Sequence, residues 1–224
     1  MKLMEHLKEL LFPPKCILCG KVLERDELDL CRDCRVNAPD HPLPKSKREF
    51  LKSWTALWYY QENVRQSILR YKFYGKRNYA VGYGRLLGMK ILRDLPEGFD
   101  VLTWVPISKW RRFRRGYDQG EVLAGEVGRQ LGVQAVPLLR KIRNNRPQSH
   151  IAGQAQRRAN VLGAYECLNR DEFMGKRVLI LDDVITTGAT VGECARVLLT
   201  AGAKEVYCAA LGAAHHQNNQ KTSR

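Results

Sequence analysis

Apolar stretches with the length of strands alternate with amphipathic stretches of helical period from Trp54 to Gly212. Parallel strands are apolar on both sides because helices cover both faces of their sheet, and crossover helices separate the strands along the chain. The alternation therefore predicts an α/β domain with a parallel sheet. The expected strands are 56–60, 100–108 running into a loop, 135–141, 176–183 and 205–212, and the expected helices are 63–75, 79–92, 120–132 and 189–202.

The composition indicates a chain that buries a core and binds anions. With 224 residues, 44% of them hydrophobic, it is long enough for one α/β domain and a small additional module. The formal net charge of +15 favours polyanions or phosphorylated small molecules as partners. Residues 1–12 predict an amphipathic helix and not a signal peptide, and no stretch approaches the roughly 20 apolar residues of a membrane span. We therefore expect a cytoplasmic protein.

Four of the seven cysteines form two Cys-x-x-Cys pairs near the start of the chain. Cys16 and Cys19 make the first pair, and Cys31 and Cys34 make the second. Each pair can direct two thiolates at one point, which is typical of a structural zinc ribbon. The alternatives are iron and a pair of disulfides, but a reducing cytoplasm keeps thiols free.

The domain organisation follows from this ribbon and the linker after it. Residues 37–50 are polar and rich in proline, which suits a linker, and His41 within it is expected to be solvated. We predict an N-terminal helix and zinc ribbon over residues 1–45 and a larger domain over residues 46–224.

The stretch "VLILDDVITTGAT", residues 178–190, joins a buried strand, two adjacent acids and a small polar turn. In parallel sheets, ligands bind beyond the carboxyl ends of the strands. Asp182 and Asp183 each disfavour ionisation of the other, so a cationic or hydroxylated partner is expected beside them. The turn opens a helix, and its backbone N–H groups and hydroxyls suit a phosphate. A helix cap would explain either the acid pair or the polar turn alone, but it does not explain the two together. The turn consists of Thr186, Thr187, Gly188, Ala189 and Thr190.

This stretch closely resembles the signature of type I phosphoribosyltransferases that binds phosphoribosyl pyrophosphate (PRPP). The resemblance implies that Asp182 and Asp183 are the catalytic acids and serve the 2- and 3-hydroxyls of the ribose. It also implies that the turn holds the 5-phosphate and that Mg²⁺ lies on the diphosphate side.

Further motifs extend the resemblance over nearly the whole chain. Together with the four-cysteine ribbon, "YKFYGKRNYAVGYGRLLG", "VPISKWRRFRRGYDQGEVLA" and "RPQSHIAGQAQRRANVLGAY" are similar to the ComF family, the competence-associated phosphoribosyltransferase-like proteins. The implied fold is a type I phosphoribosyltransferase-like parallel sheet flanked by helices, with a small N-terminal zinc ribbon.

The same resemblance assigns further groups to PRPP. The loop centred on Ile107, with Ser108 and Lys109, corresponds to the diphosphate loop. Arg140 and Lys141 match the basic pair that reaches the diphosphate, and residues 143–162 correspond to a mobile hood that closes over the substrate.

The sequence departs from the family pattern in one motif. The usual Arg-Gly-Phe-Asn-Gln is Arg-Gly-Tyr-Asp-Gln at residues 115–119. Tyr117 keeps an aromatic ring, whereas Asp118 adds a negative charge among arginines.

The basic run "KWRRFRR", residues 109–115, interleaves cations with two aromatic residues. Proteins that bind single-stranded nucleic acid combine phosphate contacts with base stacking in this way. The candidate residues are Arg111, Arg112, Arg114 and Arg115, and solvated surface charge is the alternative.

Three functions stay open at this point. The family resemblance implies a PRPP-binding protein that acts in DNA uptake during natural transformation, beside a helicase-like partner. A catalytic phosphoribosyltransferase of nucleobase salvage or nucleotide synthesis is the second. A non-catalytic adaptor that binds single-stranded DNA is the third. No residue identifies an acceptor base.

Overall fold

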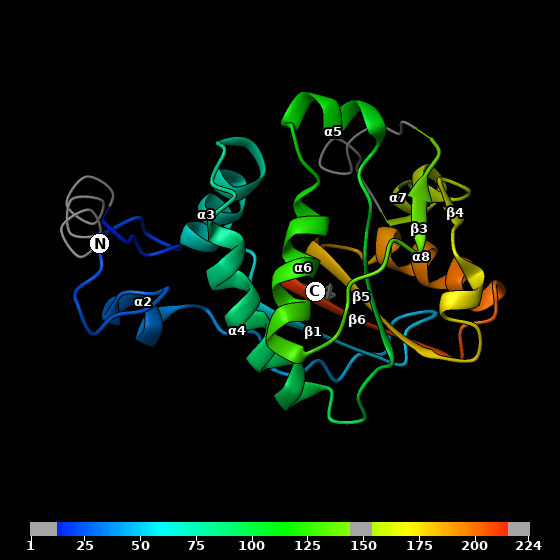
Figure 1. The fold of residues 1–224 in the computed structure, drawn as a ribbon, viewed down its shortest axis with the longest axis horizontal. Helices are drawn as coiled ribbons and strands as arrows, with labels where there is room; N and C mark the ends of the chain where they lie inside the picture. The colour runs from blue at the N-terminus through cyan, green and yellow to red at the C-terminus, as the bar shows by residue number, and fades with distance from the viewer. Residues whose placement is uncertain (1–12, 144–153, 215–224) are drawn as a thin grey trace, which may run out of the picture.

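The central sheet of the computed structural model, which describes residues 13–143 and 154–214, has four parallel strands (Figure 1). They are β1 (Ser53–Tyr59), β2 (Val101–Trp104), β5 (Arg177–Ile185) and β6 (Glu205–Ala213). Their order in the sheet is β1-β6-β5-β2, and every neighbouring pair is parallel. The predicted parallel α/β fold is confirmed.

Helices cover both faces of this sheet (Figure 1). On one face lie α3 (Glu62–Phe73), α4 (Tyr79–Asp94) and α6 (Gln119–Leu131), and on the other lies α8 (Ala189–Thr200). Two clusters of buried residues correspond to these two faces. The close approach of α4 to α6 needs a glycine, because a Cβ on Gly84 would lie 2.5 Å from Cβ of Glu126. None of the helices within the described ranges is long and apolar enough to cross a bilayer.

The predicted strand 135–141 does not join the main sheet as a strand. Ala135 makes an isolated bridge to Leu102, but Pro137 follows and has no N–H to donate to a ladder. The chain then forms β3 (Leu139–Lys141), which pairs antiparallel with β4 (Tyr165–Cys167) in a separate sheet.

Several short elements were not predicted. They are α2 (Arg32–Asn37), α5 (Lys109–Arg115), α7 (Gln154–Val161) and the 3₁₀ turn Arg170–Glu172. The expected N-terminal helix of residues 1–12 and residues 144–153 of the expected hood lie outside the described residues.

The N-terminal ribbon lies against α3 and α4 (Figure 1). Arg85 of α4 donates from Nε to Oδ2 of Asp29 over 2.8 Å. Arg70 of α3 donates from Nη2 to the Leu18 carbonyl over 2.5 Å, and Ser67 of α3 donates to the carbonyl of Ile17. The ribbon therefore shares buried contacts with the larger domain. The division of the chain at residue 45 stays a prediction.

His41 in the linker is buried, with 7% of its surface exposed, so the expectation that it is solvated is wrong. The linker folds back along β1, where the His41 N–H donates to the Leu57 carbonyl over 3.0 Å. The imidazole lies between Trp54 and Tyr59, with ring centroids 5.4 and 4.7 Å away. Burial lowers its pKa, so His41 acts as a core residue.

Candidate functional site

The two acids lie within β5 and not beyond its end. The strand continues to Ile185, since it pairs with β6 as far as Ala213. Successive side chains of a strand point to opposite faces of the sheet. Asp183 accordingly contacts α3 and α6, whereas Asp182 lines the pocket before α8 and interacts with the charges of Lys72 and, less strongly, Lys141.

Asp183 is held by two donors. Lys72 Nζ of α3 lies 2.8 Å from Oδ1, and Gln119 Nε2 of α6 lies 3.2 Å from Oδ2. The Lys72 and Asp183 side chains are only 17% and 15% exposed. Arg115 donates to Oε1 of Gln119 over 2.7 Å, which orients the amide so that its NH₂ group faces Asp183. A protein cation therefore already meets one of the two carboxylates.

Asp182 has different surroundings. Burial disfavours its charge and Asp183 adds a like charge, which together raise the pKa of Asp182 to about 8. The cations Lys72 and Lys141 oppose this shift. Oδ1 of Asp182 accepts the backbone N–H of Asp183 over 2.8 Å. A carboxyl group with such a pKa exchanges its proton near neutral pH, which is typical of functional sites.

A pocket joins Asp182, but not Asp183, to the turn that opens α8. It is lined by Asp182 and residues 184–191. Gly188 caps α8 with a left-handed φ of 80°, and Thr187 Oγ1 accepts the Ala189 N–H over 3.4 Å. The first N–H groups of a helix have no partner within it, so this turn can receive an anion. The structure thus brings together the acids and the turn residues that the sequence predicts.

A guanidinium from the linker lies against this turn. A Cβ on Gly188 would lie 2.3 Å from Nη1 of Arg48, so a larger residue would have to displace that side chain. The Arg48 guanidinium also lies over the Trp54 ring, 4.3 Å from its centroid, and burial lowers its pKa. Its charge adds to the positive end of the α8 dipole.

The loop after β2 lies beside β5 because the two strands are neighbours in the sheet. The Val105 N–H donates to the Leu181 carbonyl over 2.9 Å. Asp118 fixes the loop and begins α6: Oδ2 accepts the Ile107 N–H over 3.1 Å, and Oδ1 accepts the Gly120 N–H over 2.9 Å. The departure from the family motif therefore places a buried carboxylate among backbone donors.

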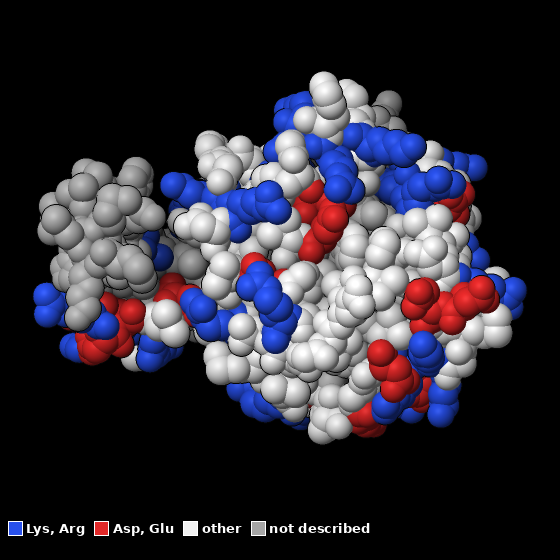
Figure 2. All heavy atoms as spheres, in the orientation of Figure 1, with Lys and Arg blue, Asp and Glu red and all other residues white. Residues whose placement is uncertain are grey.

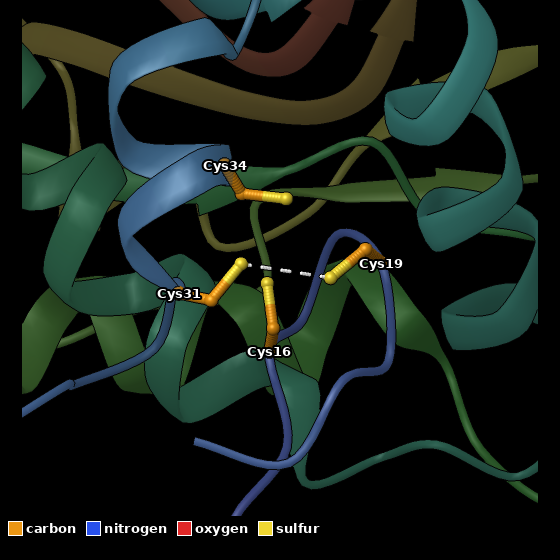
Figure 3. A group of neighbouring side chains, drawn as sticks. All are labelled: Cys16, Cys19, Cys31 and Cys34. Carbon is orange, nitrogen blue, oxygen red and sulfur yellow. Dashed lines mark hydrogen bonds between the residues drawn. The ribbon is translucent and has the colours of Figure 1, made fainter. Parts of the chain in front are cut away.

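The four ribbon cysteines form one cluster with their sulfur atoms facing one another (Figure 3). All four sulfurs lie within 4.8 Å of one another, and those of Cys19 and Cys31 are 3.7 Å apart. A tetrahedron of thiolates around an ion at ~2.3 Å has edges of ~3.8 Å. Gly20, with φ 80°, turns the chain after the first pair, and Cys31 immediately precedes α2. The cluster can hold a metal ion.

The similarity to known proteins covers most of the chain and not only this site. A family model described as "Phosphoribosyl transferase domain" matches residues 118–223, which include the acids and the turn. Competence protein F of Haemophilus influenzae is 27% identical over 206 residues, covering 86% of this chain and 82% of that protein. Competence protein ComFC of Bacillus subtilis is 28% identical over 193 residues, with coverage of 84% and 72%. DNA utilization protein YhgH of Salmonella typhimurium is 27% identical over 207 residues, with coverage of 86% and 88%.

This chain is therefore similar to the competence proteins F and ComFC over most of its length, and residues 118–223 match the phosphoribosyl transferase domain. Its fold is that of the type I phosphoribosyltransferases, as the resemblance implied. The cysteine cluster precedes the sheet, and the acids and the turn lie near the carboxyl edge of the sheet.

The two residues of the basic pair expected to reach the diphosphate point in different directions. Arg140 is exposed and forms an ion pair with Glu166 across the β3-β4 sheet. Lys141 is half-buried, with Nζ 3.2 Å from the Tyr165 hydroxyl, and burial lowers its pKa. Lys141 interacts with Asp182, whereas Arg140 is occupied at the surface.

The basic run forms the helix α5, which Ser108 begins by accepting the Arg111 N–H over 3.4 Å. Lys109 is exposed at its first position. Arg111 is half-buried and its charge lowers the pKa of Lys141 in addition to the larger effect of burial. The turn residues predicted to bind PRPP line the pocket together with Asp182, and the loop after β2 begins beside β5. The helix α5 lies at the top of Figure 1.

The other three arginines of α5 have separate partners. Arg112 lies 3.0 Å from Oε2 of Glu121, and the Arg114 guanidinium lies over the ring of Trp110. Arg115 turns inward toward Gln119, and burial lowers its pKa. The run is therefore divided between the acid site and the surface.

Sequence reasoning missed Lys72, Gln119 and Arg48. A signal for Lys72 was present, because it continues the spacing of the buried Val64 and Ile68 on α3. A charged residue in that register is unusual on a buried face. Gln119 and Arg48 carried no such signal, since their contacts depend on the tertiary fold.

Proposed function

We propose that this chain is a ComF-type protein that binds PRPP together with Mg²⁺ and acts in DNA uptake during natural transformation. The observation that carries the proposal is the pocket that joins Asp182 to the turn at the start of α8, with Asp183 next to Asp182 on β5. The names of the relatives supply the process, since two are competence proteins and one is a DNA utilization protein. We further propose a cytoplasmic location, where thiols stay reduced, and a helicase-like partner.

The chemistry of each group suits one part of PRPP. Carboxylates accept hydrogen bonds from the ribose diol, and the turn with Arg48 offers donors to the 5-phosphate. The loop at residues 105–109 and Lys141 supply donors for the diphosphate. Mg²⁺ prefers oxygen ligands, which the ligand and the acids provide, and it would offset the charge of the diphosphate. We assign zinc to the four thiolates, as a structural ion.

The test is titration calorimetry of the purified chain with PRPP, with and without Mg²⁺. Asp183→Asn is expected to weaken binding about 10- to 100-fold, because an amide cannot replace a charged acceptor. Asp171→Asn, which makes the same change at an exposed position, is the matched control. Release of diphosphate in the presence of candidate bases would reveal turnover. Absent binding by the wild type, or unchanged affinity in Asp183→Asn, contradicts the proposal.

A second ligand is supported by the surface of α5. Trp110 and Phe113 are 55% and 89% exposed, and Arg112 and Arg114 are exposed beside them. Lys and Arg side chains gather over this helix (Figure 2). Exposed aromatic rings among cations stack bases and bind phosphates. We propose single-stranded DNA as the ligand of this surface.

A further inference from the structure

Lys72 is a charged residue on the buried side of α3. Removal of an ammonium group from water is unfavourable unless a partner compensates. The partner is Asp183, at 2.8 Å, and the charge of Lys72 also favours ionisation of Asp182. A helix that only packed against the sheet would carry an apolar residue here. The lysine therefore serves the acid pair.

The backbone on either side of this contact is anchored. The Tyr71 hydroxyl donates to the Gln119 carbonyl over 2.6 Å, and the Tyr117 hydroxyl donates to the Tyr71 carbonyl. Gln119 in turn donates to the second oxygen of Asp183. The end of α3, the start of α6 and the acid thus form a closed set of hydrogen bonds. Each oxygen of Asp183 keeps lone pairs for a ligand, in directions that these contacts fix.

We propose that Lys72 is a positioning residue of the PRPP site, which holds the Asp183 carboxylate aimed at the ribose hydroxyls. This inference rests on the proposed function. PRPP brings several negative charges toward two carboxylates, and Lys72 offsets one of those carboxylate charges. The protein itself thereby supplies part of the positive charge that offsets the two adjacent acids.

The test compares three variants of the full chain by calorimetry with PRPP and Mg²⁺. Lys72→Met removes the charge but keeps a long side chain, and it is expected to weaken binding about 10- to 100-fold. Lys72→Arg restores a cation and is expected to bind within about threefold of the wild type. Lys76→Met removes an exposed lysine just after the same helix and is expected to bind like the wild type.

Melting temperature and metal content are measured on each variant. Wild-type affinity in Lys72→Met overturns the inference and leaves the proposed function intact. Equal losses in Lys72→Met and Lys72→Arg, with lowered melting temperatures, mean that the lysine only packs, which also overturns it. If the wild type does not bind PRPP, both the inference and the proposed function fail.

Discussion

Asp182 and Asp183 are chemically identical neighbours with unlike surroundings. Because β5 continues through them, one carboxyl group contacts α3 and α6 and the other lines the pocket before α8. Asp183 has a lysine partner at 2.8 Å, whereas Asp182 has a pKa raised to about 8 by burial and by its neighbour. Environments that separate two carboxyl groups in this way assign them separate roles. Asp183 is paired with Lys72 and accepts from Gln119, and Asp182 can carry a proton at neutral pH.

The raised pKa of Asp182 gives stability a defined pH dependence. Between about pH 4 and pH 8 the folded ligand-free chain holds a proton that the unfolded chain has lost, so this residue lowers stability as the pH rises. Asp182→Asn removes the effect. We expect the melting temperature of Asp182→Asn, relative to that of the wild type, to be higher at pH 8 than at pH 5. The increase should be at least about 2–4 °C, equivalent to about 1 kcal/mol.

Melting curves at both pH values check this expectation. Asp171→Asn, an exposed acid, corrects for the general effect of removing a charge. A constant difference between Asp182→Asn and the wild type at the two pH values would contradict the assigned protonation.

The kinds of residues at the site could be predicted from the sequence, but their pairings could not. The acids and the turn are contiguous, so their order along one strand and one helix places them together. Lys72 and Arg48 reach the site from distant segments, and only the packing of α3 and the linker brings them there. Arg140 was predicted to lie at the site, but the fold places it at the surface. Its neighbour Lys141 faces the acids, and strand alternation turns Arg140 outward to Glu166.

At the scale of one element, α5 shows how a helix divides a basic run. Ser108 caps its start, and Gly116 ends it with a left-handed φ of 78°. Residues four apart lie on the same side of a helix, and Arg111 and Arg115 are accordingly both half-buried. Arg115 points to the acid site, whereas Arg112 and Arg114 stay at the surface with the exposed rings. The sequence indicates the charge of this segment, but the caps and the faces decide which arginines can reach a polymer.

The exposed arginines of α5 are therefore expected to act on DNA and not on PRPP. Changing Arg112 and Arg114 to Gln should weaken binding of single-stranded DNA and lower the log-log salt slope by about 1.4, since each lost contact removes about 0.7. PRPP affinity should stay within about twofold, because the pocket residues are unchanged.

Fluorescence anisotropy with a labelled oligonucleotide over a series of salt concentrations measures the slope. The same charge change at Arg25 and Arg35, which are exposed on the ribbon, is the matched control. Parallel loss of DNA and PRPP in the α5 variant would indicate one shared anion site in place of two.

At the scale of the whole molecule, the parallel sheet and its covering helices could be predicted because their hydrophobic patterns are regular. The β3-β4 sheet could not, since Pro137 interrupts an otherwise strand-like run and β4 is only three residues long. The burial of His41 could not be predicted from the sequence either, because a polar, proline-rich linker gives no sign that it lies along β1.

The arrangement of ribbon, α3 and sheet predicts the effect of metal removal. We expect about one zinc per chain by metal analysis. Withdrawal of the ion with a zinc-selective chelator under reducing conditions should loosen the Ile17 and Leu18 carbonyls that receive Ser67 and Arg70. PRPP affinity should then fall severalfold, because Lys72 lies on the same helix.

Calorimetry after dialysis and addition of Mg²⁺ measures this loss, and restored zinc should reverse it. Unchanged PRPP affinity in the metal-free chain would contradict the expected coupling between the ribbon and the site. A chain without metal whose four ribbon cysteines are paired as disulfides would contradict the assignment of zinc.

Arg70, which donates to the ribbon, and Lys72, which pairs with Asp183, both lie in the last turn of α3. If zinc and PRPP bind as proposed, this turn links them thermodynamically: whatever factor zinc contributes to PRPP affinity, PRPP contributes equally to zinc affinity. We therefore expect a chain that has bound PRPP to retain its ion longer when thiols are oxidised or zinc is scarce.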